Sequence, residues 1–112
     1  MDEDDRQFLL TAVWLFIRHG RRERALAVCE ALHDAEPRDG TAAVALAELL
    51  VSDGRAREAL DVIRQADVPE SLEHAAAVIE TRALRLAGRA AEADSRWRRH
   101  LEARKGAARR WI

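Results

Sequence analysis

Apolar residues recur along this chain with the period of an α-helix, and glycine, proline or polar residues interrupt them at regular intervals. Pro37 and Pro69 lie in two of these interruptions, where the missing N–H of proline costs least. The expected fold class is therefore all-α. We predict helices over six ranges: 5–18, 22–35, 41–53, 56–66, 71–87 and 90–104.

Three glycines divide this pattern into equal parts, because Gly20, Gly54 and Gly88 are each 34 residues apart. An arginine follows each glycine directly, and an alanine follows each glycine after five residues. Gly20 and Gly54 end apolar runs where the chain must reverse through a left-handed residue, a conformation that glycine adopts without a Cβ clash. The alanines would let neighbouring helices approach closely.

A period of 34 residues with small residues at the helix crossings resembles the tetratricopeptide repeat, in which each unit is a pair of antiparallel helices. Ala25 and Pro37 then match the crossing alanine and closing proline of the family, whereas Glu80 and Thr81 depart from its usual Leu-Gly pair. The resemblance implies three tetratricopeptide-like helix pairs in a short right-handed solenoid. It predicts one domain over 1–104, with repeats at about 6–38, 40–70 and 71–104, and a basic C-terminal tail over 105–112.

Composition and charge support this fold class and narrow the range of partners. Ala, Leu, Arg and Glu dominate the 112 residues, which favours a single small helical domain. The formal net charge of -1 argues against nucleic acid as a partner, since a nucleic-acid-binding protein needs surplus cations. Residues 79–112 nevertheless carry a net charge of +6, so residues 1–78 carry -7. The chain is electrically polarised along its length.

The chain begins with an acidic run, Asp2 to Asp5, which is unlike the cationic start of a signal peptide. The apolar run that follows is too short to cross a bilayer. We therefore expect a cytoplasmic protein with no membrane insertion. Cys29 is the only cysteine, which excludes an internal disulfide and favours the role of a small buried hydrophobic residue.

No group of residues with catalytic or metal-binding spacing is found in the sequence. The four histidines lie in different segments, without the spacing or the cysteine partners of a zinc site. A nucleophile motif of the form G-x-S-x-G and a glycine-rich phosphate loop are both missing. We expect no enzyme activity, no metal and no cofactor.

The predicted first helix is apolar around its whole circumference, since the run from Phe8 to Ile17 has a single non-apolar member, Thr11. Neighbouring helices would cover part of this surface, and the remainder would meet another chain, a client or a tail. The alternative is that the acidic N-terminal residues fold over it.

In tetratricopeptide repeats the first helix of each pair lines a concave groove, so the resemblance also predicts a partner-binding surface. This groove would be apolar near Trp14 and cationic near Arg82 and Arg85, which suits a peptide with an apolar anchor and an acidic stretch. The alternative is that its valines are ordinary helix packing. Trp111 and Ile112 would either belong to a disordered tail or cover apolar surface. The predicted partner contacts are Leu10, Trp14, Ile17, Val44, Glu48, Val51, Val78, Arg82 and Arg85.

A narrower resemblance joins these features over residues 6–104. The order and spacing of several short blocks resemble the YscY family of small type III secretion chaperones, and the block from Phe8 to Trp14 is the distinctive one. The arginine-rich C-terminal tail departs from the family pattern. The matching blocks are Arg6-Gln7-Phe8-Leu9-Leu10, Trp14-Leu15, Gly20, Glu23-Arg24-Ala25, Ala31-Leu32, Pro37, Gly88, Ala93 and His100-Leu101-Glu102.

This resemblance implies a non-enzymatic bacterial protein of the cytoplasm that binds a small secreted type III substrate of the YscX type. Such a chaperone keeps its client soluble and competent for export, and it engages the export gate of the secretion apparatus, a setting linked to virulence. Two alternatives remain at this point. One is a chaperone for a needle or translocator subunit, and the other is a self-associating adaptor that forms a homodimer through residues 5–18.

Overall fold

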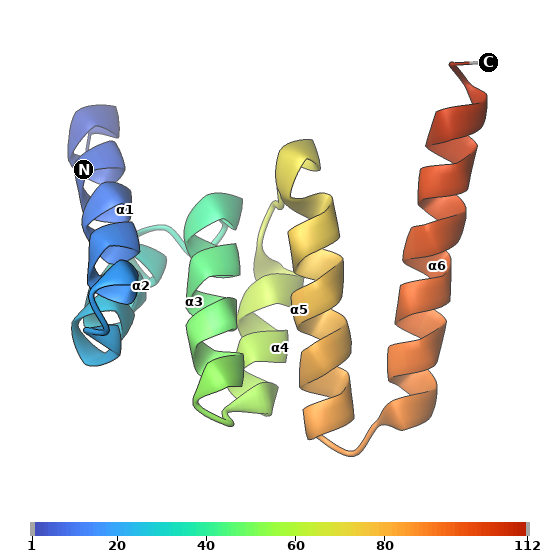
Figure 1. The fold of residues 1–112 in the computed structure, drawn as a ribbon. Coiled ribbons are helices and arrows are strands. Elements are labelled where there is room, and N and C mark those ends of the chain that lie inside the picture. The colour runs from blue at the N-terminus through green and yellow to red at the C-terminus, as the bar shows by residue number, and fades with distance from the viewer. Residues whose placement is uncertain (1, 112) are drawn as a thin grey trace.

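The computed structural model describes residues 2–111, which form six α-helices and one short 3₁₀ turn, so the predicted all-α class is confirmed (Figure 1). The neighbouring helices that pack together are α1 with α2, α2 with α3, α3 with α4, α3 with α5, α4 with α5, and α5 with α6. The helices are α1 (Glu3–Arg18), α2 (Arg22–Ala35), α3 (Gly40–Ser52), α4 (Ala56–Gln65), α5 (Glu73–Leu86) and α6 (Ala90–Arg109), with the 3₁₀ turn η1 at Glu70–Leu72.

The same turn joins α1 to α2, α3 to α4 and α5 to α6. Gly20, Gly54 and Gly88 have φ of 72°, 78° and 78°, as predicted for two of them, and no other described residue has positive φ. Each glycine N–H donates to the carbonyl three residues back, and the next N–H donates to the carbonyl five residues back, at N···O distances from 2.7 to 3.2 Å. These two hydrogen bonds define a Schellman cap. A single type of turn therefore recurs every 34 residues.

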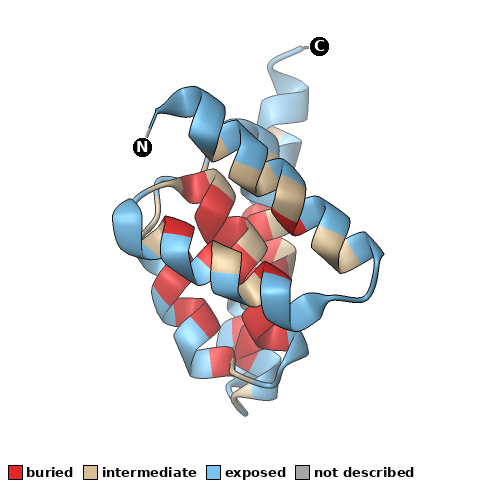
Figure 2. Ribbon diagram, turned by 90° about the vertical axis from the view of Figure 1, so that its left-hand side faces the viewer, coloured by how far each residue is buried: buried red, intermediate tan, exposed pale blue. Residues whose placement is uncertain are grey.

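The alanines five residues after these glycines are core residues. Ala25, Ala59 and Ala93 are buried and belong to one apolar cluster that runs through the molecule. Figure 2 shows that buried positions gather between the helices, and most of them come from α3, α4 and α5. In α1 only Val13 is buried. The first helix thus covers one side of the core and leaves most of its own surface exposed.

The helices differ from the predicted ranges mainly at their ends. Helix α1 begins two residues early because Asp2 caps it, its carboxylate accepting a hydrogen bond from the Asp5 N–H at 2.8 Å. Helix α5 begins two residues late because η1 precedes it. Helix α6 continues to Arg109 rather than stopping at 104, since Gly106 is the only weak helix former in a run of Ala, Arg and Lys.

The predicted packing of the C-terminal aromatic residue over apolar surface is wrong. Residues 105–109 are helical, and the side chain of Trp111 is 91% exposed. Ile112, to which the same prediction applied, lies outside the described residues. The end of α6 extends past the start of its neighbour α5 (Figure 1).

Charged side chains hold the connections between helix pairs. The Arg6 guanidinium donates two hydrogen bonds to the carboxylate of Asp39, which also caps α3 through the Thr41 and Ala42 N–H groups. The Asp67 N–H donates to the Arg38 carbonyl at 2.9 Å, which brings the segment after α4 against the start of α3. Gly40 lies at this contact, and a Cβ there would be 2.1 Å from the Asp67 carbonyl oxygen.

Candidate functional site

Of the nine predicted contact residues, three come from each of the helices α1, α3 and α5, and they divide into equivalent sets. Trp14, Glu48 and Arg82 occupy the same position in successive 34-residue units. The same is true of Leu10 with Val44 and Val78, and of Ile17 with Val51 and Arg85. A surface made of these sets would therefore cross the three helices in parallel rows.

Helix α1 contributes the exposed part of this surface. The Trp14 side chain is 58% exposed, and the Arg18 guanidinium carbon lies 6.0 Å from the centre of its ring, within the range of a cation–π contact. Leu10 and Ile17 are half-buried, and Ile17 packs against the core on one side. These three side chains form an apolar surface that a partner can reach.

The valines of α3 are packing residues. Val44 and Val51 are buried and belong to the apolar core, so the packing alternative holds for both. Val78 on α5 is half-buried. The expected apolar floor of the groove is therefore accessible mainly at α1.

The expected cationic end of the groove is occupied by carboxylates of the same chain. Arg82 Nη1 lies 3.2 Å from an oxygen of Glu48, and Arg85 Nη2 lies 3.2 Å from an oxygen of Asp94. All four side chains are well exposed, so water screens both pairs and a partner can compete for them. Both arginines were predicted to make this end of the groove cationic, and their pairing with carboxylates of other helices reduces that positive charge.

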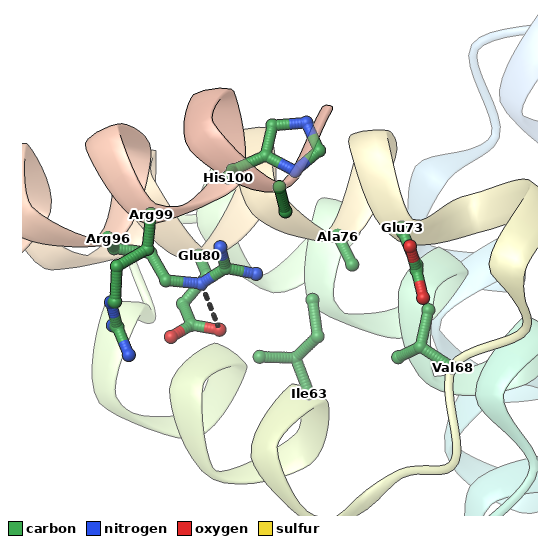
Figure 3. A pocket seen from close by; sticks show the side chains of 9 residues that line it. Ile63, Val68, Glu73, Ala76, Glu80, Arg96, Arg99 and His100 are labelled. Atoms are coloured by element: carbon green, nitrogen blue, oxygen red, sulfur yellow. Dashed lines mark ion pairs between the residues drawn. The ribbon is translucent and has the colours of Figure 1, made fainter. Parts of the chain in front are cut away.

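A cleft of about 350 Å³ that sequence reasoning missed lies between α4, α5 and α6 (Figure 3). Ile63, Val68 and Ala76 form its apolar part. Glu80 is mostly buried there and pairs with two arginines, Arg64 Nε at 3.6 Å and Arg96 Nε at 3.4 Å. The sequence held one indication of this cleft. Glu80 places a carboxylate where the repeat pattern has a leucine.

Beside this cleft, two histidines from different helices share a hydrogen bond. His74 Nδ1 and His100 Nε2 are 2.9 Å apart, and Arg104 Nη1 is 3.0 Å from the same His74 nitrogen. Arg104 can only donate, whereas the donor of the hydrogen bond between the two histidines is set by their tautomers. Burial lowers the pKa of His100, and the nearby His74 lowers it further. Folding therefore favours the neutral ring of His100, and the hydrogen bond between the two histidines joins α5 to α6.

Cys29 is buried, and its chemistry follows from that burial. Burial raises the pKa of the Cys29 thiol to about 11, so it stays protonated and acts as a core side chain. Within residues 2–111, no three His, Cys, Asp or Glu side chains gather as a metal site requires. Among the helices of this range, none combines the length and the apolar character needed to span a bilayer.

The chain was compared with known protein families, with curated proteins and with solved structures, and none of them matches it.

Proposed function

We propose that this chain is a protein-binding module of the tetratricopeptide type, in which three helix pairs form a short right-handed solenoid and act without enzymatic chemistry. The observation that carries the proposal is the recurrence of one Schellman turn at Gly20, Gly54 and Gly88. The arginines after these glycines repeat φ within -95° to -104° and ψ within 58° to 62°. The same reversal within each of the three helix pairs, at a spacing of 34 residues, is what a repeat of this type requires, and this supports the proposal.

The partner surface in this proposal crosses the concave side of the first helices of the three pairs. Its anchor is the apolar surface of Leu10, Trp14 and Ile17, because an exposed tryptophan flanked by aliphatic side chains is typical of a binding hot spot. Farther along, Glu48 and Arg82 offer a charge of each sign. An amphipathic or extended peptide with an apolar end and an acidic end fits this order, with the acidic end displacing Glu48 from Arg82.

The particular form of the proposal is a cytoplasmic type III secretion chaperone of the YscY type. Its support is the sequence resemblance in the block from Phe8 to Trp14, together with the apolar and largely exposed surface of α1. The client would be a small secreted protein of the YscX type, and the export gate would be a second partner. The Val44, Val51 and Val78 contacts then act by shaping the groove rather than by touching the client over a wide area.

The test is co-expression with a YscX-type secretion protein, followed by co-purification through a tag on this chain. The wild-type chain should retain the client through gel filtration. Trp14→Ala should release it, since truncation of a central aromatic anchor commonly costs 2 kcal/mol or more, roughly a 30-fold loss of affinity. Trp111→Ala is the matched control, because that tryptophan is even more exposed but lies outside the groove.

Equal retention by the wild type and both variants would contradict the groove assignment. If the chain retained a needle or translocator subunit and not the YscX-type protein, the proposal of a binding module would stand and the proposed client would be wrong. A homodimer that forms through residues 5–18 and binds neither client would favour the adaptor function.

A further inference from the structure

Helix α1 exposes an apolar face that is separate from the proposed groove. Phe8 and Leu15 are 72% and 48% exposed, and they share a face because they lie seven residues apart. Leu10 and Ile17 are also seven residues apart, but a shift of two residues turns them to a different side of the helix. A partner in the groove would therefore leave the Phe8–Leu15 face uncovered.

The equivalent positions of the later helices show what this face packs against. Phe8 corresponds to Ala42 and Ala76, and Leu15 corresponds to Leu49 and Ala83. All four of these later residues are buried.

The helix that comes before each later helix in the chain contacts this face. Leu49 of α3 shares a small cavity with Leu26 of α2, and Ala76 of α5 shares the larger cleft with Ile63 of α4, a cleft that α6 also lines. The Arg64–Glu80 ion pair joins α4 to α5 along the same side. The Phe8–Leu15 face is thus one on which a preceding helix packs, and in α1 it is exposed.

Helix α6 offers the matching surface at the other end. In α2 and α4 the residues equivalent to Trp97 are Cys29 and Ile63, and both are buried. Trp97 is half-buried, with its ring 5.9 Å from that of His74 on α5, and Leu101, one turn further on, is 38% exposed. Lys105 follows on the same side, in a stretch that also contains Arg104, Arg109 and Arg110.

We propose that the chain associates head to tail, with α6 of one copy packing on the Phe8–Leu15 face of α1 in a second copy, as α2 packs on α3 and α4 on α5. The occupant is a second copy because the charges match. Within the chain, the end of α2 adjoins the start of α3, and the end of α4 adjoins the start of α5. In the same arrangement, the cationic end of α6 meets the acidic start of the second copy's α1, Asp2 to Asp5.

The register of the Arg64–Glu80 pair makes this contact specific. Arg98 of α6 is equivalent to Arg64, and Ala12 of α1 is equivalent to Glu80. The same register therefore places Arg98 of one copy opposite Ala12 of the second copy. Since the two helices run antiparallel, Lys105 then lies opposite Asp5, and Leu101 lies beside Phe8. The contact uses different surfaces on the two copies, so it cannot form a symmetric dimer and instead generates a larger assembly, either an open chain or a ring of copies.

Light scattering of the purified chain tests the proposal first. The mean mass should rise with concentration without levelling at a dimer, and it should fall when salt is raised, because exposed charges are screened. Phe8→Asp blocks one end and Leu101→Asp blocks the other, and each variant alone should be monomeric. Both residues are exposed, and circular dichroism checks that both variants remain helical.

The decisive step is to mix the two variants. Each keeps the end that the other has lost, so an equimolar mixture should form a 1:1 dimer and stop there. A wild-type chain that stays monomeric up to about 1 mM, where even weak contacts are populated, overturns the proposal. So does a mixture that stays monomeric, or a Leu101→Asp variant that dimerises alone, which would indicate a symmetric α1–α1 contact.

A charge swap tests the register independently of the apolar contact. Lys105→Glu should weaken association about two- to five-fold, the range expected for one exposed pair, and adding Asp5→Lys in the same chain should restore it. Failure of the double variant to recover would overturn the register. Client binding through the groove uses the other side of α1, so loss of association with retained client binding, or the reverse, separates this proposal from the proposed function.

Discussion

Glu48 and Arg82 occupy the same position in consecutive 34-residue units, and their side chains form an ion pair between α3 and α5 with an N···O distance of 3.2 Å. Trp14 holds that position in α1, where its side chain is exposed. One position of the repeat thus presents an aromatic ring, a carboxylate and a guanidinium in turn. The row changes from apolar to charged along the proposed groove, which gives a bound peptide a direction.

The three Schellman turns predict a shared sensitivity to substitution of their glycines. Gly20→Ala, Gly54→Ala and Gly88→Ala should each lower the free energy of unfolding by about 1–2 kcal/mol, because a Cβ is disfavoured at positive φ. No atom lies within 4 Å of the added Cβ at these sites, so the effect is purely conformational. Urea denaturation measures it.

Gly106→Ala is the matched control for these substitutions. Gly106 lies inside α6 without positive φ, and its added Cβ also meets nothing within 4 Å. Alanine should therefore stabilise the helix there, by about 0.5–1 kcal/mol. If all four variants shifted in the same direction, the left-handed turns would not explain the glycine spacing.

Gly40→Ala should be more damaging than the turn variants. Its Cβ would meet the backbone of Asp67 and Val68 at 2.1 to 2.7 Å, and a backbone cannot move aside as a side chain can. The start of α3 would have to separate from the segment after α4, with an expected loss of about 2–3 kcal/mol in chemical denaturation. Arg38→Ala removes only an exposed ion pair at the same junction, and a loss as large as that of Gly40→Ala would contradict the steric account.

Asp39 makes the α1–α3 junction sensitive to acid. Hydrogen bonds from Arg6, and then from the Ala42 and Thr41 N–H groups, lower the pKa of Asp39 below its ordinary 3.8. Because the pKa of Asp39 is lower in the folded state than in the unfolded state, its carboxylate stabilises the fold at any pH above the unfolded-state pKa. This contribution is lost as the pH falls from about 4 through the lowered pKa. The difference in unfolding free energy between the wild type and Asp39→Asn should be large at pH 7 and should shrink below pH 4. A difference that does not change with pH would show that the carboxylate charge is not responsible.

His100 predicts a second pH effect in a different range. Burial, then the electrostatic effects of His74, Arg96 and Arg104, lowers the pKa of His100 below its ordinary 6.5, against a weaker opposite effect of Glu73. Folding therefore favours the neutral ring, and the stability that this residue contributes is present above pH 6.5 and lost as the pH falls through the lowered pKa.

Thermal unfolding of the wild type and of His100→Gln from pH 7.5 to 5 measures this effect. The wild type should lose more stability over that range than the variant, whose side chain does not titrate. Identical slopes for the two proteins would exclude His100 as the sensitive group.

The sequence predicted the turns well because each depends on one residue. Only glycine adopts positive φ without strain, so the spacing of Gly20, Gly54 and Gly88 specified the three reversals directly. The end of α6 was harder to predict, since a single Gly106 resembles a stop signal although the alanines and cations around it favour helix.

The partner surface was predictable only in outline. The 34-residue period identified which side chains occupy equivalent positions in the three units. It could not show that Val44 and Val51 are buried, because their burial depends on how closely α3 and α5 approach. Pairing of Arg85 with Asp94 depends on the path of α6 beside α5, which no local pattern contains. The Glu80 cleft was missed for the same reason, because its two arginines come from different helices.

In the proposed function, a partner binds across the first helices of the pairs and is anchored at Trp14. A ¹H–¹⁵N NMR titration of this chain with the YscX-type secretion protein tests this binding. The amides of Leu10, Trp14 and Ile17 and the Trp14 indole N–H should shift, and the Trp111 indole signal should stay unchanged. Shifts confined to α2, α4 or α6, with the Trp14 indole unmoved at saturation, would contradict it.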